Sequence, residues 1–236
     1  MRKMVVASMA LGMLLVAGAA QAEDKFGTGI ILGVDRLWGI GMYSQTQSSD
    51  ENGVDYEEKT SRTAVNLLLA GSPASVYQVP RLAFDYGLGN GLTVGGNLGY
   101  ISQSGSSQMK KPSEGEEVDL PKTSGFLIAP RVGYALELAE GIYIWPRAGI
   151  TYYSTKTTIE AGAAKNEDTL SGFGLNVEGM LLWSPVPHFG LTIGPVFDYT
   201  LSGKAKSKQT GAVTAESEKD MTEMNIGLAS GIVGWF

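Results

Sequence analysis

Residues 170–183 read LSGFGLNVEGMLLW, and this stretch decides the fold. Its odd-numbered positions from Phe173 to Trp183 are large and apolar except for Gly179, whereas its even-numbered positions include Gly172, Gly174, Asn176 and Glu178. Successive side chains of a strand point to opposite faces, so a period of two predicts a β-strand. The same alternation recurs in residues 126–138, 142–152 and 189–201. Each segment is long enough to cross a bilayer as a tilted strand.

Composition excludes several classes of protein. The 236 residues are 43% hydrophobic and 18% charged, with 32 glycines and no cysteine. A chain without cysteine has no disulfide scaffold, thiol catalysis or N-terminal lipoprotein anchor. The formal net charge of −6 makes nucleic acid a poor candidate partner.

The first 22 residues, MRKMVVASMALGMLLVAGAAQA, have the layout of a secretory signal peptide. Arg2 and Lys3 form a basic start, an apolar run follows, and Ala20-Gln21-Ala22 is a small-residue cleavage site before Glu23. A permanent membrane anchor is the alternative, but the uncharged run is short for a spanning helix. No later run is long enough for a transmembrane helix, whereas a β-barrel needs only short alternating segments.

Short and long connections alternate along the chain. Residues 89–91, 139–141 and 185–187 are tight links, whereas residues 47–59, 105–121, 160–168 and 203–219 are longer, polar and charged. This rhythm is typical of a transmembrane barrel with short periplasmic turns and long external loops. It predicts an antiparallel eight-stranded transmembrane β-barrel, with strands near residues 27–46, 60–88, 92–104, 122–138, 142–159, 169–184, 188–203 and 220–236.

Residues 60–88 are too long for one strand, and Gly71-Ser72-Pro73-Ala74-Ser75 interrupts them. Two interpretations are open. The segment forms two crossings, which gives nine strands, or it forms one return strand that is broken by a bulge or by an extension above the membrane. We favour the single return strand, because nine crossings would place charged loops on the periplasmic side.

Lysine placement favours a membrane barrel over a soluble one. A soluble barrel presents a hydrated outer face with interspersed lysine and glutamate. Here no lysine falls in the strand bodies, and the face opposite the apolar one carries mainly small residues, as the narrow lumen of eight strands requires.

Aromatic residues share the apolar parity, often near strand ends, as in an interfacial girdle: Tyr86, Tyr100, Tyr134, Tyr152, Trp183, Phe189, Tyr199 and Phe236.

The final strand has a polar-glycine start at Ser230-Gly231 and an aromatic end at Phe236. Here the chain resembles bacterial outer-membrane β-barrel proteins, whose last strand carries an assembly signal that ends in an aromatic residue. Over residues 23–236 it is most similar to the small OmpA/OmpX-type eight-stranded barrels. The resemblance implies localisation in the bacterial outer membrane after export. It also implies outer-membrane lipid and the barrel-assembly machinery as partners, with the partner of the external loops unknown.

Charged residues also occupy the luminal parity of the strands. Arg81, Arg131 and Arg147 each follow a proline, which we expect to mark a bulge, and lie at a similar predicted depth. Buried charge is costly unless it is paired. The predicted luminal charge cluster, in which at least one arginine bridges two carboxylates, is Asp35, Arg81, Asp85, Arg131, Glu137, Arg147, Glu178 and Asp198. It is either a selectivity ring or a structural plug, and the narrow lumen favours the plug.

Arg36 does not fit this pattern, because it falls on the lipid-facing parity. A bulge near it or snorkelling of its side chain are both open as explanations.

Little in the sequence points to catalysis. His188, the only histidine, lies in a predicted periplasmic turn, and the acidic segments 50–58 and 114–119 lack EF-hand spacing. We therefore expect no enzymatic activity, no cofactor and no metal site. The favoured hypothesis is a structural or interaction protein that displays surface loops. The alternative is a narrow channel for ions or small apolar molecules, and a lipid-modifying enzyme comes third.

The alternation generates a first testable prediction. A continuous lipid-facing band means that the mature chain should require detergent for solubility and should change its gel mobility on boiling. Gel electrophoresis of boiled and unboiled samples checks this. A mature chain that stays soluble and monomeric without detergent would contradict it.

Overall fold

The computed structural model describes residues 25–51, 54–67, 75–108, 117–161, 164–211 and 214–236. The predicted signal peptide lies outside this part of the chain. Among the described residues, no helix has the length and hydrophobicity needed to cross a membrane. The elements are β1 (Thr28–Glu51), β2 (Val54–Leu67), the 3-10 turn η3 (Val76–Gln78), β3 (Arg81–Leu88), β4 (Leu92–Gln103), β5 (Ser106–Gln108), β6 (Glu117–Asp119), β7 (Lys122–Tyr134), β8 (Leu136–Ala139), β9 (Ile142–Ala161), β10 (Ala164–Val186), β11 (Phe189–Thr210) and β12 (Ala215–Trp235).

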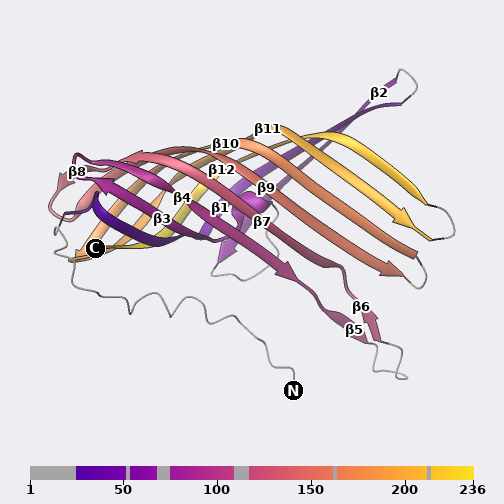
Figure 1. Cartoon of the computed structure of the whole chain (residues 1–236), viewed down its shortest axis with the longest axis horizontal. Helices are drawn as coiled ribbons and strands as arrows, with labels where there is room; N and C mark the ends of the chain where they lie inside the picture. The colour runs from indigo at the N-terminus through magenta and orange to yellow at the C-terminus, as the bar shows by residue number, and fades with distance from the viewer. Residues whose placement is uncertain (1–24, 52–53, 68–74, 109–116, 162–163, 212–213) are drawn as a thin grey trace.

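The long strands form a closed antiparallel barrel (Figure 1). The ring runs β1, β3, β4, β7, β9, β10, β11 and β12, and β12 pairs with β1 to complete it. Backbone hydrogen bonds between Ile30 and Phe236, both 2.9 Å, extend the closing seam to the last residue. The prediction of an eight-stranded barrel is confirmed.

The ambiguous segment 60–88 is one return path with a break in it. Strand β2 pairs with β1 from Trp38 to Glu51, and β3 pairs with β1 from Thr28 to Asp35. Both therefore lie along the same side of one strand, and no ninth crossing is needed. Between them the short turn η3 enters the barrel, where Tyr77 is fully buried.

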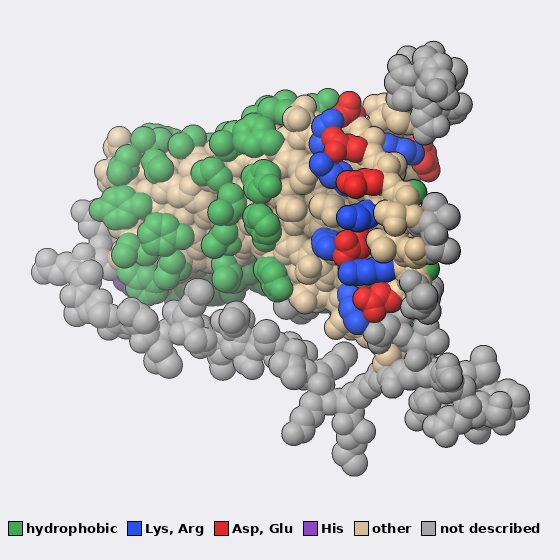
Figure 2. Space-filling view, turned by 45° about the vertical axis from the view of Figure 1, so that its right-hand side comes forward, with side chains coloured by type: hydrophobic (Ala, Val, Ile, Leu, Met, Phe, Trp, Pro, Cys, Tyr) green, Lys and Arg blue, Asp and Glu red, His purple; other side chains and the backbone are tan. Residues whose placement is uncertain are grey.

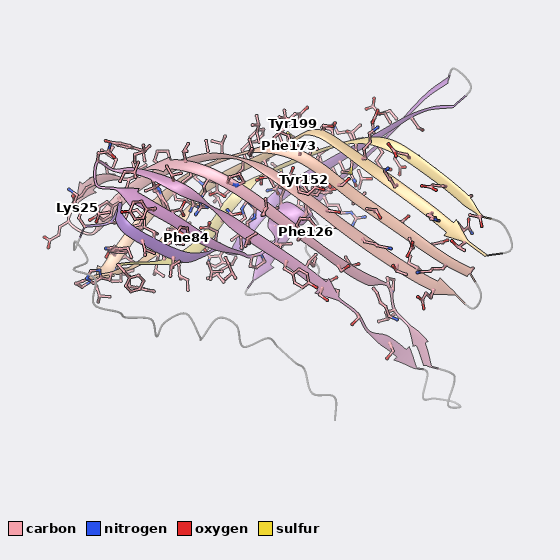
Figure 3. All side chains as sticks on the ribbon, viewed as in Figure 1. Lys25, Phe84, Phe126, Tyr152, Phe173 and Tyr199 are labelled. Carbon is pink, nitrogen blue, oxygen red and sulfur yellow. The ribbon has the colours of Figure 1, made fainter. Side chains whose placement is uncertain are left out.

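The two faces of the wall separate as the alternation predicts. Burial alternates residue by residue along β10 and β11. Large apolar side chains face outward and form a belt; the labelled Phe84, Phe126, Tyr152, Phe173 and Tyr199 mark it in Figure 3.

Inside the end that carries the tight turns, aromatic rings fill the lumen. The Phe26 ring makes edge-on contacts with Tyr143, Trp145 and Trp235 at centroid distances of 5.4, 5.0 and 5.3 Å. Such contacts stabilise aromatic pairs beyond the area that they bury. This end of the barrel is closed by packed side chains.

Two details of the sequence prediction are wrong. Residues 47–59, 160–168 and 203–219, expected to be long loops, are mostly strand in their described part, because β1, β2 and β9 to β12 continue into them. Cross-strand charge pairs such as Lys206–Glu218, at 2.7 Å, support these polar extensions. Pro130 and Pro146 do not mark bulges either, because the ladders keep their register on both sides of them. Pro80 lies just before β3, outside the paired residues.

The placement of the turns generates a prediction of topology. The tight turns containing Asn90 and His188 lie at the same end of the barrel as Phe26, whereas β10 to β12 extend from the opposite end (Figure 1). We expect Ser106→Cys and Ser207→Cys to react with an impermeant thiol reagent on intact cells, and Asn90→Cys and His188→Cys to react only after permeabilisation. The native chain has no cysteine to interfere. The reverse labelling pattern would refute this orientation.

Candidate functional site: a buried layer of charge in the lumen

A layer of charged side chains crosses the middle of the barrel. Six different strands contribute to it, and each of these side chains is at most 4% exposed: Asp35 and Arg36 from β1, Arg81 and Asp85 from β3, Arg131 from β7, Arg147 from β9, Glu178 from β10 and Asp198 from β11. The luminal parity of each strand places these residues inside, apart from Arg36. Seven of the eight predicted cluster residues therefore share the lumen.

Arg131 bridges two carboxylates. Its Nη1 lies 2.5 Å from Asp35 Oδ2, and its Nη2 and Nε donate to the two oxygens of Asp85 at 2.6 and 3.0 Å. Such a bidentate ion pair fixes the relative orientation of the two side chains as well as stabilising their contact. Glu178, another member of the predicted cluster, is farther from Arg131 at 3.7 Å.

Asp35 joins a second arginine to the same network. Its Oδ1 accepts a hydrogen bond from Arg147 Nη1 at 3.1 Å, while Arg147 Nη2 lies 2.6 Å from Glu178 Oε2. The Arg147 guanidinium also stacks over the Trp145 ring, 4.4 Å from its centroid. A cation over an aromatic face gains further electrostatic stabilisation. The layer is thus continuous with the aromatic packing of the closed end.

Arg36 is the residue that the sequence pattern missed. A bulge shifts the ladder register between Val34 and Trp38, and Arg36 itself has a positive φ of 57°. This turns its side chain into the lumen, where it pairs with Glu178 at 2.9 Å and Asp198 at 2.7 Å. Of the two explanations left open, the bulge is correct. The available signal was a second charge directly after the luminal Asp35.

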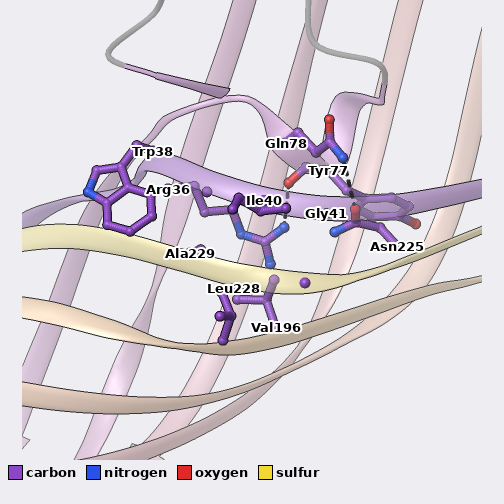
Figure 4. A pocket seen from close by; sticks show the side chains of 12 residues that line it. Arg36, Trp38, Ile40, Gly41, Tyr77, Gln78, Val196, Asn225, Leu228 and Ala229 are labelled. Carbon is purple, nitrogen blue, oxygen red and sulfur yellow. Dashed lines mark hydrogen bonds between the residues drawn. The ribbon is translucent and has the colours of Figure 1, made fainter. Parts of the chain in front are cut away.

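Arg81 lies in the layer but is not paired as predicted. Within the described part of the chain no carboxylate comes within ion-pair distance of it. Its Nη2 donates to the Tyr77 carbonyl at 2.9 Å, and its Nε and Nη1 have no partner there. Arg36 also donates to the Tyr77 carbonyl (Figure 4). It is Arg36 that pairs with Glu178 and Asp198.

Glu137 is the one predicted cluster residue that lies outside the lumen, and its inclusion was wrong. The pairing register with β9 is unchanged from Arg131 to Glu137, so Glu137 keeps the luminal parity, but it lies beyond the buried layer in depth along the barrel. Glu137 is exposed at the barrel mouth and forms an ion pair with Lys25 at 2.7 Å. The hydrogen bond and the charge of this carboxylate raise the pKa of Lys25 above its ordinary value.

The turn η3 covers the other side of the layer. The Tyr77 ring packs edge-on against Tyr153 at 5.3 Å, and its hydroxyl shares a 2.8 Å hydrogen bond with Thr200. The Gln78 amide donates to Asn225 Oδ1 at 3.2 Å (Figure 4). The charged layer is therefore enclosed between the aromatic packing at one end and the Tyr77 contacts at the other.

This arrangement suits structural closure better than chemistry. Across the described residues, no group of three or more histidine, cysteine, aspartate or glutamate side chains could hold a metal ion. The luminal carboxylates are instead engaged by guanidinium groups. His188 sits in its turn with Nδ1 3.1 Å from the Trp235 carbonyl oxygen.

Comparison with known proteins concerns the fold. No protein-family model matches the chain, and no curated protein does so either. The structure is similar to the outer membrane protein OprG from Pseudomonas aeruginosa, with a TM-score of 0.50, 11% sequence identity, and coverage of 87% of this chain and 96% of that chain. Neisserial surface protein A has a TM-score of 0.44 at 13% identity, with 89% of this chain and 98% of that chain covered. Ail, the attachment invasion locus protein of Yersinia pestis, has a TM-score of 0.35 at 12% identity, with 87% and 99% covered.

The closed ring of strands and the likeness to OprG identify the fold as that of a small outer-membrane β-barrel, the OmpA/OmpX-type class that the sequence resembles.

The contrast between two buried arginines generates a stability prediction. Removing one partner of a buried ion pair typically costs about 3–5 kcal/mol, because a charge is left uncompensated. Arg131→Met should lower the free energy of unfolding by this amount, since Asp35 and Asp85 both lose a partner. Arg81→Met should cost clearly less, because it removes two nitrogen atoms without partners along with one hydrogen bond. Unfolding curves in detergent compare the two variants, which are matched in residue type and burial. Equal losses would contradict the assignment of ion-pair energy to Arg131.

Proposed function

We propose that this chain is an integral protein of the bacterial outer membrane with a structural or interaction role and no enzymatic activity. Residues 1–22 direct export, residues 23–236 form the barrel, and the C-terminal strand ending at Phe236 is the segment that the barrel-assembly machinery recognises. The closed barrel anchors polar hairpins that extend beyond the membrane, where their partner binds.

The single observation that carries this proposal is the enclosed charge layer. Arg36, Arg131 and Arg147 each contact two carboxylates, and the layer spans the lumen from β1 to β11. An ion that passed through would have to separate such pairs, and a buried charge left uncompensated typically costs about 3–5 kcal/mol. A plug explains this geometry better than a selectivity ring, which presents rings of charge to an open, hydrated path.

The polar extensions supply the surface for an interaction role. On β11, nine further strand residues follow Leu201 before the turn, and β10 begins well before the outward Phe173. These extensions are regular, antiparallel and largely exposed on both faces (Figure 1). A strand scaffold holds its side chains in fixed positions, which favours recognition by lowering the ordering cost on binding.

The plug generates a prediction that separates this role from a channel. The purified wild-type protein in a planar bilayer should show negligible conductance. The alternative is a narrow channel for ions or small apolar molecules. Steady, charge-selective currents through the wild-type protein would support such a channel for ions. An Arg131→Ala variant that alters this selectivity without lowering stability would overturn the plug.

A further inference from the structure

The outward aromatic girdle is incomplete on one side of the barrel. At the end away from the tight turns, the strands β4, β7, β9, β10 and β11 carry Tyr100, Phe126, Tyr152, Phe173 and Tyr199 on their outer face. Along the register, Tyr199 pairs with Met224 on β12. The next outward positions at this level are Ser44 on β1 and Ser61 on β2. A flexible methionine and small hydroxyl residues replace rings there.

A hollow of about 340 Å³ occupies this gap in the girdle. Its apolar floor is formed by Met42, Met224 and Ile226, which are exposed on the outer face. Hydroxyl side chains of β1 and β2 line its side, and Lys59 lies at the end farther from the tight turns. The lining of the hollow is therefore apolar nearest the tight-turn end, then polar, and cationic farthest from it.

Lys59 contrasts with four lysines of β9, β10 and β11 near this level. A band of acidic and basic side chains follows the apolar surface in Figure 2. In it Lys156 and Lys165 pair with Glu167, each at 2.8 Å, and Lys204 and Lys206 pair with acids of β12, each at 2.7 Å. Within the described ranges Lys59 has no such carboxylate. A compact ammonium group of this kind binds phosphate as a point charge.

We propose that this hollow is a binding site for one lipid with a phosphate-bearing headgroup, with an acyl chain over the methionine floor and the phosphate on Lys59. The proposal rests on the membrane placement in the proposed function. A lipid is favoured over a soluble anion because the floor is apolar and faces the bilayer. The aromatic girdle also marks the headgroup level, where Lys59 is placed to meet a phosphate.

The test measures lipid binding to the delipidated barrel in detergent by native mass spectrometry. The probes are dioleoyl phosphatidate and dioleoyl phosphatidylcholine, which share their acyl chains but differ in headgroup charge. We expect wild type to prefer phosphatidate by roughly five- to tenfold, the contribution of one lysine near a charged headgroup. Lys59→Gln should clearly reduce the preference, while Arg62, the other cation that lines the hollow, remains in this variant. Lys25→Gln, at the opposite end of the barrel, is the matched control and should retain it.

A second variant tests the hollow itself. Thr63→Trp fills the space with a ring and should weaken binding of both lipids, while unfolding and heat-modifiable mobility stay unchanged because Thr63 is exposed. Equal binding of the two lipids by wild type, or an unchanged preference in Lys59→Gln, would overturn the site in favour of unselective annular lipid. Competition by inorganic phosphate at the same concentration as the lipid would show an anion site instead. Failure of heat-modifiable mobility in wild type, by contrast, would refute the membrane placement.

Discussion

The requirement that buried charge be paired controls the interior of this barrel. Asp35 is central, since its two oxygens bind Arg131 and Arg147 from two other strands. The next residue, Arg36, completes the layer by binding Glu178 and Asp198. Two adjacent residues of a regular strand cannot both face the lumen, so the bulge in β1 is the conformational cost of this pairing. The ladder register, the filled lumen and the depth of the charge layer all follow from that local departure.

Strand β1 also explains the break in the return strand. It pairs with β3 before the bulge and with β2 after it, so its partner changes where its own register changes. The gap between β2 and β3 gives η3 its route inward. There the Tyr77 carbonyl accepts from both Arg36 and Arg81. The bulge and the plug are therefore parts of one arrangement.

The sequence was sufficient for everything that depends on a period of two. Strand number, the lipid-facing and luminal faces, and most of the charge layer follow from alternation, because each long segment has one apolar parity. Arg36 was placed on the wrong face because a count of alternating positions contains no bulge, and only the second charge directly after Asp35 signals one. Glu137 was placed in the cluster because alternation gives the face of a residue but not its depth along the barrel. Tyr77 was missed because a short turn that enters a lumen has no periodicity.

The closing seam has a consequence for how the chain acquires its structure. The backbone pair between Ile30 and Phe236 joins the first and the last strand of the barrel. Contacts with such a large sequence separation form slowly, because the entropy of closing the loop must be overcome before the contact contributes. Until they form, β1 and β12 present unpaired edges, which apolar lipid does not tolerate. The cylinder is therefore a late product of folding, and a ribosome that stopped a few residues short of Phe236 would release a sheet that cannot close its seam.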